Sequence, residues 1–221
     1  ISTGGMMPPE ADAVVMVEHV KREDKRITLD RAVHAGEHIV PRGSEARAGA
    51  LLVAAGSRMG YAELALAAQV GATRLEVFAM PRLAVLSTGD EVVDARETAG
   101  PLQVRNSNGI SIEVLARTGG AQTVQLGNAP DEKNALREKI NRGLDADILV
   151  LSGGVSMGEF DLVEQVLEDL GAKFHFTGVA MRPGRPAVFA TCRGKLVFGL
   201  PGNPVSTMVT FELFVLPAID F

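Results

Sequence analysis

The stretch that decides the fold lies at residues 147–161 and reads DILVLSGGVSMGEFD. Four consecutive apolar residues, 148–151, lead directly into a loop that contains three glycines. A continuous apolar run of this length is typical of a parallel strand that is buried on both faces of its sheet. Glycines directly after such a strand let the backbone approach a bound group closely. The stretch therefore indicates an α/β domain with a ligand site at the carboxyl end of a strand.

Strand and helix signals alternate on both sides of this stretch, from residue 81 to the end of the chain. Strands are predicted at 83–87, 123–126, 147–152, 173–178, 187–191 and 195–199, and helices at about 107–117, 131–142, 160–170 and 204–216. This alternation predicts an α/β domain over residues 81–221, built on an open, doubly wound, mostly parallel sheet with an antiparallel pair near its end.

The N-terminal third of the chain has a different rhythm. A β-branched run at 13–18 and shorter runs at 26–29 and 38–40 alternate with Gly and Pro turns, and they predict a partial β-rich domain at residues 1–48. The alanine-rich stretch 60–70 has helical spacing of its apolar residues, and an extended segment follows at 74–78. Residues 49–80 are therefore interpreted as a helical connector that completes an N-terminal domain.

Composition excludes several classes of protein. The 221 residues include 22 Lys and Arg against 27 Asp and Glu, and a net charge of −5 disfavours a general nucleic-acid binder. A single cysteine allows no internal disulfide, and no stretch approaches the roughly 20 apolar residues of a membrane span. We expect a cytoplasmic protein without membrane contact. The chain begins with Ile1 and shows no signal-peptide pattern, so a segment of a longer protein is expected.

Three further loops rich in Gly, Pro and polar residues follow predicted strands, at 87–91, 181–186 and 199–204. Because the carboxyl ends of parallel strands share one edge of a sheet, we expect these loops to converge with residues 152–161. Backbone N–H groups of the glycine loops and the predicted helix starts near Phe160 and Pro204 favour the binding of an anion. A phosphate is therefore the expected ligand. For 199–204 a tight turn before a helix-starting proline stays an equal alternative.

Acidic residues gather at the same predicted edge. They fall in loops or at helix starts, at Asp90, Glu91, Asp131, Glu159 and Asp161. Carboxylates beside a phosphate repel it unless a cation lies between them, and Mg²⁺ is typically held by one or two carboxylates plus ligand phosphates. The pattern therefore predicts Mg²⁺ or another divalent cation. Helix N-capping stays open as an alternative role for Asp131 and Asp161.

Two arginines separated by Pro-Gly, Arg182 and Arg185, can form charge-assisted bonds to a phosphate or another oxyanion. Solvated surface arginines are the alternative. The four histidines are scattered without the spacing of a zinc site, so structural or surface roles are expected for them.

Five motifs in order carry a family resemblance: STGDE at 87–91, NSN at 106–108, SGGVSMGEFD at 152–161, MRPGRP at 181–186 and GLPGNPVS at 199–206. With them the chain closely resembles MoeA, the molybdopterin molybdenumtransferase family, which includes the E domain of gephyrin. STG at 2–4 and ADAVV at 11–15 also look like the family's middle region. Measured against that family, the chain is expected to be truncated at both ends.

The resemblance implies insertion of molybdate into adenylylated molybdopterin, with release of AMP and help from a divalent cation. It implies catalytic roles for Glu91, Asp131, Asp161, Arg182 and Arg185, and cation ligands at Asp90, Glu91, Asp131 and Asp161. The implied ligand-binding residues are Thr3, Glu45, Thr88, Gly89, Asp90, Ser152, Gly153, Gly154, Val155, Ser156, Gly158, Pro201, Gly202, Asn203 and Ser206.

The same resemblance implies a homodimer in which Thr3 and Glu45 lie at the partner subunit's site, and contact with the molybdopterin adenylyltransferase. Glu45 stands where many relatives have Asp, and both arginines stand where many have Lys, which changes the geometry of an oxyanion contact. One alternative is the adenylyltransferase itself, whose loop generally reads GGTG where this chain has Val155 and Ser156. A gephyrin-like scaffold is the other.

Overall fold

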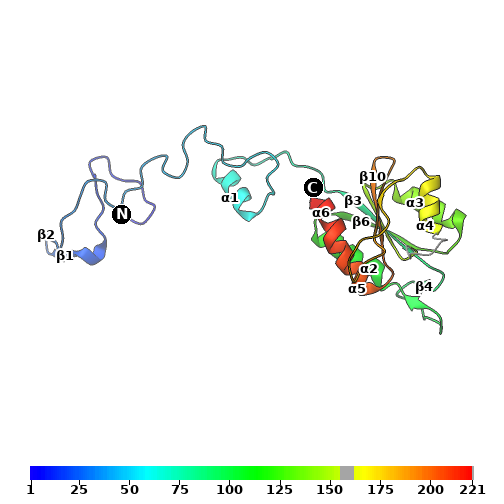
Figure 1. The fold of residues 1–221 in the computed structure, drawn as a ribbon. Coiled ribbons are helices and arrows are strands. Elements are labelled where there is room, and N and C mark those ends of the chain that lie inside the picture. The colour runs from blue at the N-terminus through cyan, green and yellow to red at the C-terminus, as the bar shows by residue number, and fades with distance from the viewer. Residues whose placement is uncertain (155–161, 221) are drawn as a thin grey trace. The chain divides into compact units, whose positions relative to one another are not determined.

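A computed structural model describes residues 1–154 and 162–220 of the chain (Figure 1). The chain divides into two compact units, Ile1–Glu76 and Val77–Phe221. The domain ranges 1–48, 49–80 and 81–221 stay a prediction. No helix among the described residues is long and apolar enough to cross a membrane.

The first unit contains little regular structure. A 3-10 turn, Val17–His19, precedes an antiparallel hairpin of β1 (Val20–Glu23) and β2 (Arg26–Leu29), and the helix α1 spans Tyr61–Gln69. The strand predicted at 26–29 and the helix predicted at 60–70 are thus confirmed. The strands predicted at 13–18 and 38–40 are wrong. Neither segment forms a ladder: Val14 N of the first donates to the carbonyl oxygen of Glu37 at 3.0 Å, and Glu37 lies just before the second.

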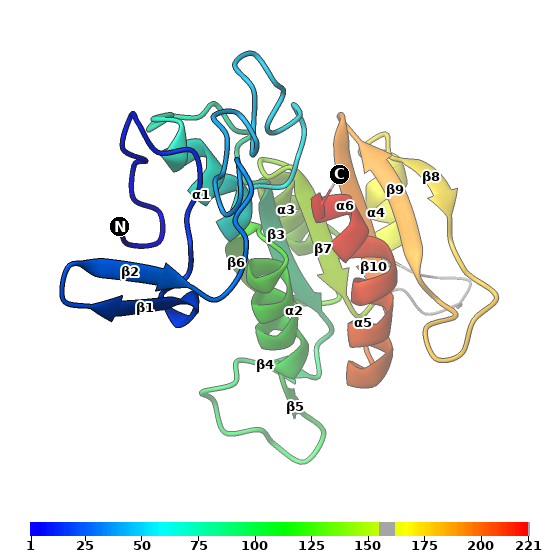
Figure 2. The same ribbon diagram turned by 90° about the vertical axis from the view of Figure 1, so that its left-hand side faces the viewer.

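The second unit is built on a six-stranded sheet with the order β6-β3-β7-β10-β9-β8 (Figure 2). Its strands are β3 (Arg82–Thr88), β6 (Gln122–Ala129), β7 (Ile148–Ser152), β8 (Lys173–Phe176), β9 (Val188–Cys192) and β10 (Lys195–Leu200). The first four strands in this order run parallel, whereas β9 is antiparallel to both β10 and β8. The predicted open, mostly parallel sheet with an antiparallel part near its end is confirmed.

Helices cover both faces of this sheet, as the doubly wound prediction requires (Figures 1 and 2). One face carries α3 (Lys133–Gly143) and α4 (Leu162–Asp169), whose buried residues include Leu136, Ile140 and Val166. The other face carries α2 (Ser107–Thr118), α5 (Pro204–Thr210) and α6 (Leu216–Asp220), with a core that includes Ile112 and Phe211. Strands β3 and β7 lie between the two apolar layers, which explains their continuous apolar sequences.

The prediction of a single α-helix at 204–216 is wrong for residues 211–215. A π-helical turn, Phe211–Val215, separates α5 from α6. Pro217 has no N–H, and its ring would clash with the carbonyl group four residues earlier, so a regular α-helix cannot continue through this position. The π-helical turn lies just before this position.

A second small sheet was not predicted from the sequence. Strands β4 (Val92–Val93) and β5 (Val104–Arg105) pair in parallel in the segment between β3 and α2. Strands of two residues are too short to produce a periodic pattern. This small sheet starts directly after the predicted acidic residues and therefore helps to fix their position.

Candidate functional site

The loops after three adjacent strands meet at one edge of the sheet. The register pairs Ser87 of β3 with Ser152 of β7, and Ser152 with Leu200 of β10, so the three strands end together. Strand β9 begins at Val188, which pairs with Gly199 near the end of β10. The segment 177–187 before β9 therefore lies at this same edge. The segment 181–186, which contains Arg182 and Arg185, is called the arginine loop. The structure thus brings it together with the loops that follow β3, β7 and β10.

Two glycines after β7 pack tightly against the end of β3. Gly153 and Gly154 have φ values of +90° and +64°. A Cβ atom on Gly153 would lie 2.7 Å from the carbonyl oxygen of Thr88, and one on Gly154 would lie 2.6 Å from Thr88 Oγ1. Thr88 is 1% exposed, and its hydroxyl has no hydrogen-bond partner among the described residues. A buried polar atom without a partner is uncommon, and it offers a hydrogen bond to a ligand or a water molecule.

The turn after β10 lies against the same glycines. Gly153 N donates to Leu200 O at 3.1 Å, and a Cβ on Gly202 would lie 3.7 Å from Gly153 Cα. Asn203 Oδ1 accepts hydrogen bonds from the backbone N–H groups of Val205 and Ser206 at 3.1 and 3.4 Å. These two N–H groups at the start of α5 are therefore occupied by a capping side chain. The expectation that the start of α5 helps to bind a phosphate stays a prediction, and the Asn203 cap agrees with the alternative of a tight turn before a helix-starting proline.

An acidic turn follows β3. Residues 89–92 form a turn closed by a bond from Val92 N to Gly89 O at 3.2 Å, with Asp90 and Glu91 at its centre. Asp131 N donates to Asp90 Oδ1 at 3.0 Å. The pKa of Asp131 is raised, first because partial desolvation penalises its charged form, and next because the carboxylates of Asp90 and Glu91 lie nearby. The structure thus brings these three acids together.

The capping role considered for Asp131 is wrong. Glu132 occupies the N-cap position of α3, and no side chain caps that helix start. Within residues 1–154 and 162–220, no three His, Cys, Asp or Glu side chains form a group that could hold a metal ion by themselves. The predicted site residues Val155, Ser156, Gly158 and Asp161 lie outside the described residues.

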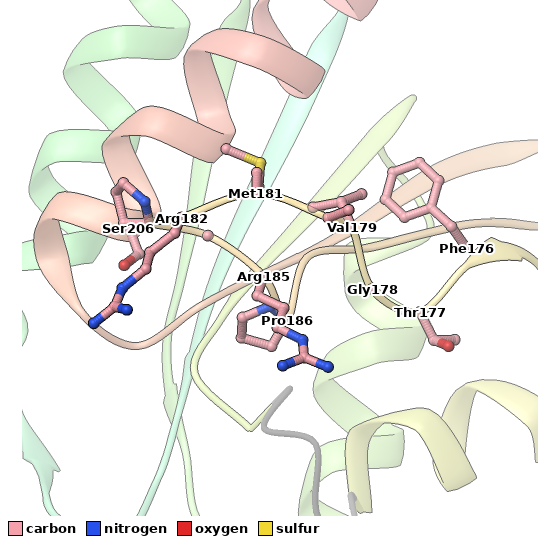
Figure 3. Close-up of a pocket in the computed structure, with 12 residues that line it drawn as sticks. Phe176, Thr177, Gly178, Val179, Met181, Arg182, Arg185, Pro186 and Ser206 are labelled. Carbon is pink, nitrogen blue, oxygen red and sulfur yellow. The ribbon is translucent and has the colours of Figure 1, made fainter.

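The arginine loop lines an open pocket of about 1240 Å³ (Figure 3). Its walls are formed by residues 176–186 together with Ser206 of α5. In Figure 3 the guanidinium groups of Arg182 and Arg185 extend away from Met181, and Arg182 lies beside Ser206. Neither guanidinium has an ion-pair or hydrogen-bond partner among the described residues. Two uncommitted cations in one pocket favour an oxyanion.

Two predicted ligand residues belong to the first unit. Thr3 lies in an exposed turn closed by a bond from Gly5 N to Ser2 O at 2.9 Å. Glu45 is exposed, and its Oε2 accepts from Gln69 Nε2 of α1 at 3.4 Å. Their part in a site of the second unit stays a prediction.

Asparagine side chains hold this edge together, and sequence reasoning assigned them no role. Asn128 Nδ2 donates to the carbonyl oxygens of Gly89 and Val92, both at 2.9 Å, and so fixes the acidic turn to β6. Asn106 and Asn108 bind the ends of β3, β7 and β10. For Asn106 and Asn108 the sequence signals were the NSN motif at 106–108 and the position of Asn106 before a predicted helix, which favours an N-cap. Nothing in the sequence pointed to Asn128.

Two known protein families match the chain, each over a different part of it. Residues 84–220 match the family described as "Probable molybdopterin binding domain". Residues 1–71 match the MoeA N-terminal region, domains I and II. The first match covers more than half of the chain and contains the whole edge described above.

Curated relatives resemble the chain along its full length. The molybdopterin molybdenumtransferase of Nostoc sp. is 38% identical over 99% of this chain and 51% of that protein. The protein of the same name from Bacillus subtilis is 35% identical over 100% of this chain and 52% of that protein. The chain therefore spans about half the length of the curated relatives it matches.

Solved structures agree with these matches. The molybdopterin biosynthesis MoeA protein from Pyrococcus horikosii superposes with a TM-score of 0.77 at 34% identity, over 97% of this chain and 54% of that one. A molybdenum cofactor biosynthesis protein B is similar at a TM-score of 0.51 and 17% identity, which shows a shared fold alone. The chain belongs to the MoeA family, with a probable molybdopterin binding domain at residues 84–220 behind a MoeA N-terminal region.

Proposed function

We propose that the full-length protein inserts molybdate into adenylylated molybdopterin and releases AMP in molybdenum cofactor biosynthesis. One observation carries this proposal: a glycine pair, an acidic turn and an uncommitted arginine pair all lie at one edge of the sheet in the second unit. The names of the relatives, which are molybdopterin molybdenumtransferases, support the same reaction.

Phosphate and nucleotide bind at the glycine loops in this proposal. The backbone of Gly153 and Gly154 approaches the ligand, since neither residue has a side chain in the way. Thr88 supplies its unpartnered hydroxyl. Gly89, Ser152 and the turn 201–203 line the same edge, and the predicted residues Val155, Ser156 and Gly158 continue the loop in sequence.

A divalent cation, Mg²⁺ in the first instance, binds beside this phosphate. The pKa of Asp131 is raised, first by its partial desolvation and next by the nearby carboxylates of Asp90 and Glu91, and a cation bound beside these acids relieves their repulsion of Asp131. Their all-oxygen donor set suits Mg²⁺, which needs only one or two carboxylates plus phosphate oxygens. Asp161 is proposed as a further ligand. When bound, the cation would stabilise the charge that develops as the phosphoanhydride breaks.

Molybdate binds in the pocket of the arginine loop. Arg182 and Arg185 supply two cations without partners, and Ser206 supplies a hydroxyl group beside Arg182 (Figure 3). The arginines also stabilise negative charge on the leaving phosphate. Glu91, in the acidic turn, positions molybdate or a water molecule.

The active assembly is proposed to be a cytoplasmic homodimer that receives its substrate from the molybdopterin adenylyltransferase. The first unit exposes large apolar side chains, among them Met6, Val40, Leu51 and Tyr61, each more than 70% exposed. Apolar surface of this kind favours contact with another protein surface. Thr3 and Glu45 would approach the partner's site in such a dimer. Light scattering of the full-length protein tests the dimer, and a monomeric mass contradicts it.

The reaction is tested by measuring AMP release from adenylylated molybdopterin by the full-length protein, with and without molybdate. We expect release only with molybdate, and a loss of at least about a hundredfold in Glu91→Ala, because a group that acts in the transition state is removed. Asp145→Ala is the matched control, since Asp145 is exposed just before β7, at the opposite edge. Formation of adenylylated molybdopterin from ATP and molybdopterin without molybdate would favour the adenylyltransferase instead.

A further inference from the structure

Two buried hydroxyl groups at the ends of β3 and β7 are each paired with an asparagine from the start of α2. Ser87 and Ser152 are each 3% exposed. Ser87 Oγ donates to Asn106 Oδ1 at 2.9 Å, and Ser152 Oγ accepts from Asn108 Nδ2 at 2.8 Å. Buried polar groups need such partners. The first turn of α2 is therefore bonded to the ends of two neighbouring strands.

Asn108 joins two loops with a single amide group. Besides Ser152 Oγ, its Nδ2 donates to the carbonyl oxygen of Gly202 at 2.9 Å. Both amide hydrogens are thus used, one on the loop after β7 and one on the turn after β10. The reverse orientation of the amide would place Oδ1 against the Gly202 carbonyl, where two acceptors repel. The nitrogen is therefore the atom that this position requires.

The helix start that carries Asn108 is itself held in place. Asn106 Oδ1 accepts from Gly109 N at 2.8 Å as well as from Ser87 Oγ. A Cβ on Gly109 would lie 2.9 Å from the Asn106 amide nitrogen, so a larger residue at 109 would displace the Asn106 side chain. Asn108 consequently has a fixed position relative to β3, β7 and β10, which are neighbours in the sheet.

We propose that Asn108 is a positioning residue that holds the glycine loop after β7 and the turn after β10 at the separation a phosphate-bearing ligand requires. This role rests on the proposed function, because it concerns the same edge of the sheet. Both N–H groups of Asn108 are used within the protein, on Ser152 Oγ and on the Gly202 carbonyl oxygen, so the amide nitrogen acts on the two loops and not on the ligand.

The chemistry of the position explains why other side chains fail there. Asn108→Ala removes the hydrogen bonds to Ser152 Oγ and to the Gly202 carbonyl oxygen, so the loop after β7 and the turn after β10 are no longer joined through this side chain. Aspartate keeps the size of the side chain but offers only acceptors, so the Ser152 hydroxyl can turn to donate to it while the Gly202 carbonyl is repelled. The carboxylate also adds negative charge close to a bound phosphate. We therefore expect Asn108→Asp to impair ligand binding more than Asn108→Ala does.

The experiment compares wild-type full-length protein with Asn108→Ala, Asn108→Asp and the control Asn141→Ala. Asn141 is also an asparagine of a helix end, and its Oδ1 accepts from Arg193 Nη1 at 3.0 Å, away from the proposed site. Three quantities are measured: hydrogen exchange of the Gly153 amide, which bonds to Leu200 O, the Kd for inorganic pyrophosphate, and the KM and kcat of AMP release.

For Asn108→Ala we expect at least tenfold faster exchange at Gly153, a pyrophosphate Kd raised about tenfold, and a KM raised more than kcat falls. Asn141→Ala should match wild type. Unchanged exchange or unchanged Kd in a folded Asn108→Ala protein overturns the proposal. So does a lower yield of active protein with unchanged KM, which marks a merely structural residue.

The outcomes for wild type separate this proposal from the proposed function. If wild type binds pyrophosphate but releases no AMP with molybdate, the proposed function fails, and exchange and Kd still decide the role of Asn108. If wild type does not bind pyrophosphate, the proposed role of Asn108 fails, and AMP release still decides the proposed function.

Discussion

Gly153 has a backbone conformation and a close contact that together require glycine. Its φ is +90°, and a Cβ would lie 2.7 Å from a backbone oxygen that cannot move aside easily. The importance of this glycine and its neighbour could be predicted from the sequence, because a glycine pair after a buried strand is a local pattern. Their contact with Thr88 could not, since that depends on the register of two strands far apart in the chain.

Replacing Gly153 by alanine should lower the free energy of unfolding by about 3 kcal/mol, because backbone strain and a steric clash add together. The control is Gly171→Ala. Gly171 also has a positive φ of +82°, but nothing lies within 4 Å of its added Cβ, so only about 1 kcal/mol is expected. Urea denaturation of both variants measures the difference. Equal losses would contradict the close packing at Thr88.

Asp131 should weaken the folded protein when it is ionised. Its pKa is raised above the ordinary 3.8, so stability falls as pH rises through the range just above 3.8. Asp131→Asn removes this loss. Because Asp131 is exposed and solvent screens it, the gain at pH 7 should stay below about 0.5 kcal/mol, or about 1–2 °C in Tm. Thermal unfolding at pH 7 and pH 3 checks this, and a gain that persists at pH 3 would contradict the assigned cause.

Among the elements, the strands inside the sheet were the most predictable. The strands predicted at 83–87, 147–152 and 195–199 are observed with nearly the same bounds, because an apolar run buried on both faces leaves a clear sequence pattern. The run at 13–18 has similar composition and forms no strand. β propensity alone does not form a strand, since a strand needs a partner and a surface to pack on. Neither can be read from the run itself.

Helix α2 (Ser107–Thr118) depends on Asn106, the residue that caps its N-terminus. Asn106→Ala removes the N-cap and leaves the buried Ser87 hydroxyl without its acceptor, so unfolding should become easier by about 2 kcal/mol. Asn106→Asp keeps an acceptor oxygen and should cost less than half of this. Asn134→Ala, an exposed change on α3, should stay within about 0.5 kcal/mol. Chemical denaturation that finds all three variants alike would contradict the anchoring of α2.

In the molecule as a whole, buried hydrophobic residues are unevenly distributed between the two units. All of the buried hydrophobic residues found in the described part of the chain lie in the second unit, between Leu83 and Ile219. The alternation of strands and helices predicted this core. The sequence could not show how little the first unit buries, because its apolar content is ordinary and burial depends on contacts between distant segments.

This division predicts different behaviour of the two units in isolation. A fragment of residues 77–221 should unfold cooperatively on heating, because it contains both apolar layers of the sheet. A fragment of residues 1–76 should show no cooperative transition, since its buried apolar surface cannot offset the loss of chain entropy. Calorimetry of both fragments checks this. A sharp transition in the fragment of residues 1–76 would contradict the conclusion that the first unit buries too little apolar surface to fold by itself.

We propose that phosphate, nucleotide and oxyanion all bind where the loops after β3, β7 and β10 meet the arginine loop. A crystal structure of the full-length protein soaked with AMP and molybdate would show where these ligands bind. We expect the AMP phosphate within hydrogen-bond distance of the 152–154 backbone or Thr88 Oγ1, and molybdate between Arg182, Arg185 and Ser206. Both ligands at the opposite edge of the sheet, or on separate faces of the second unit, would contradict it.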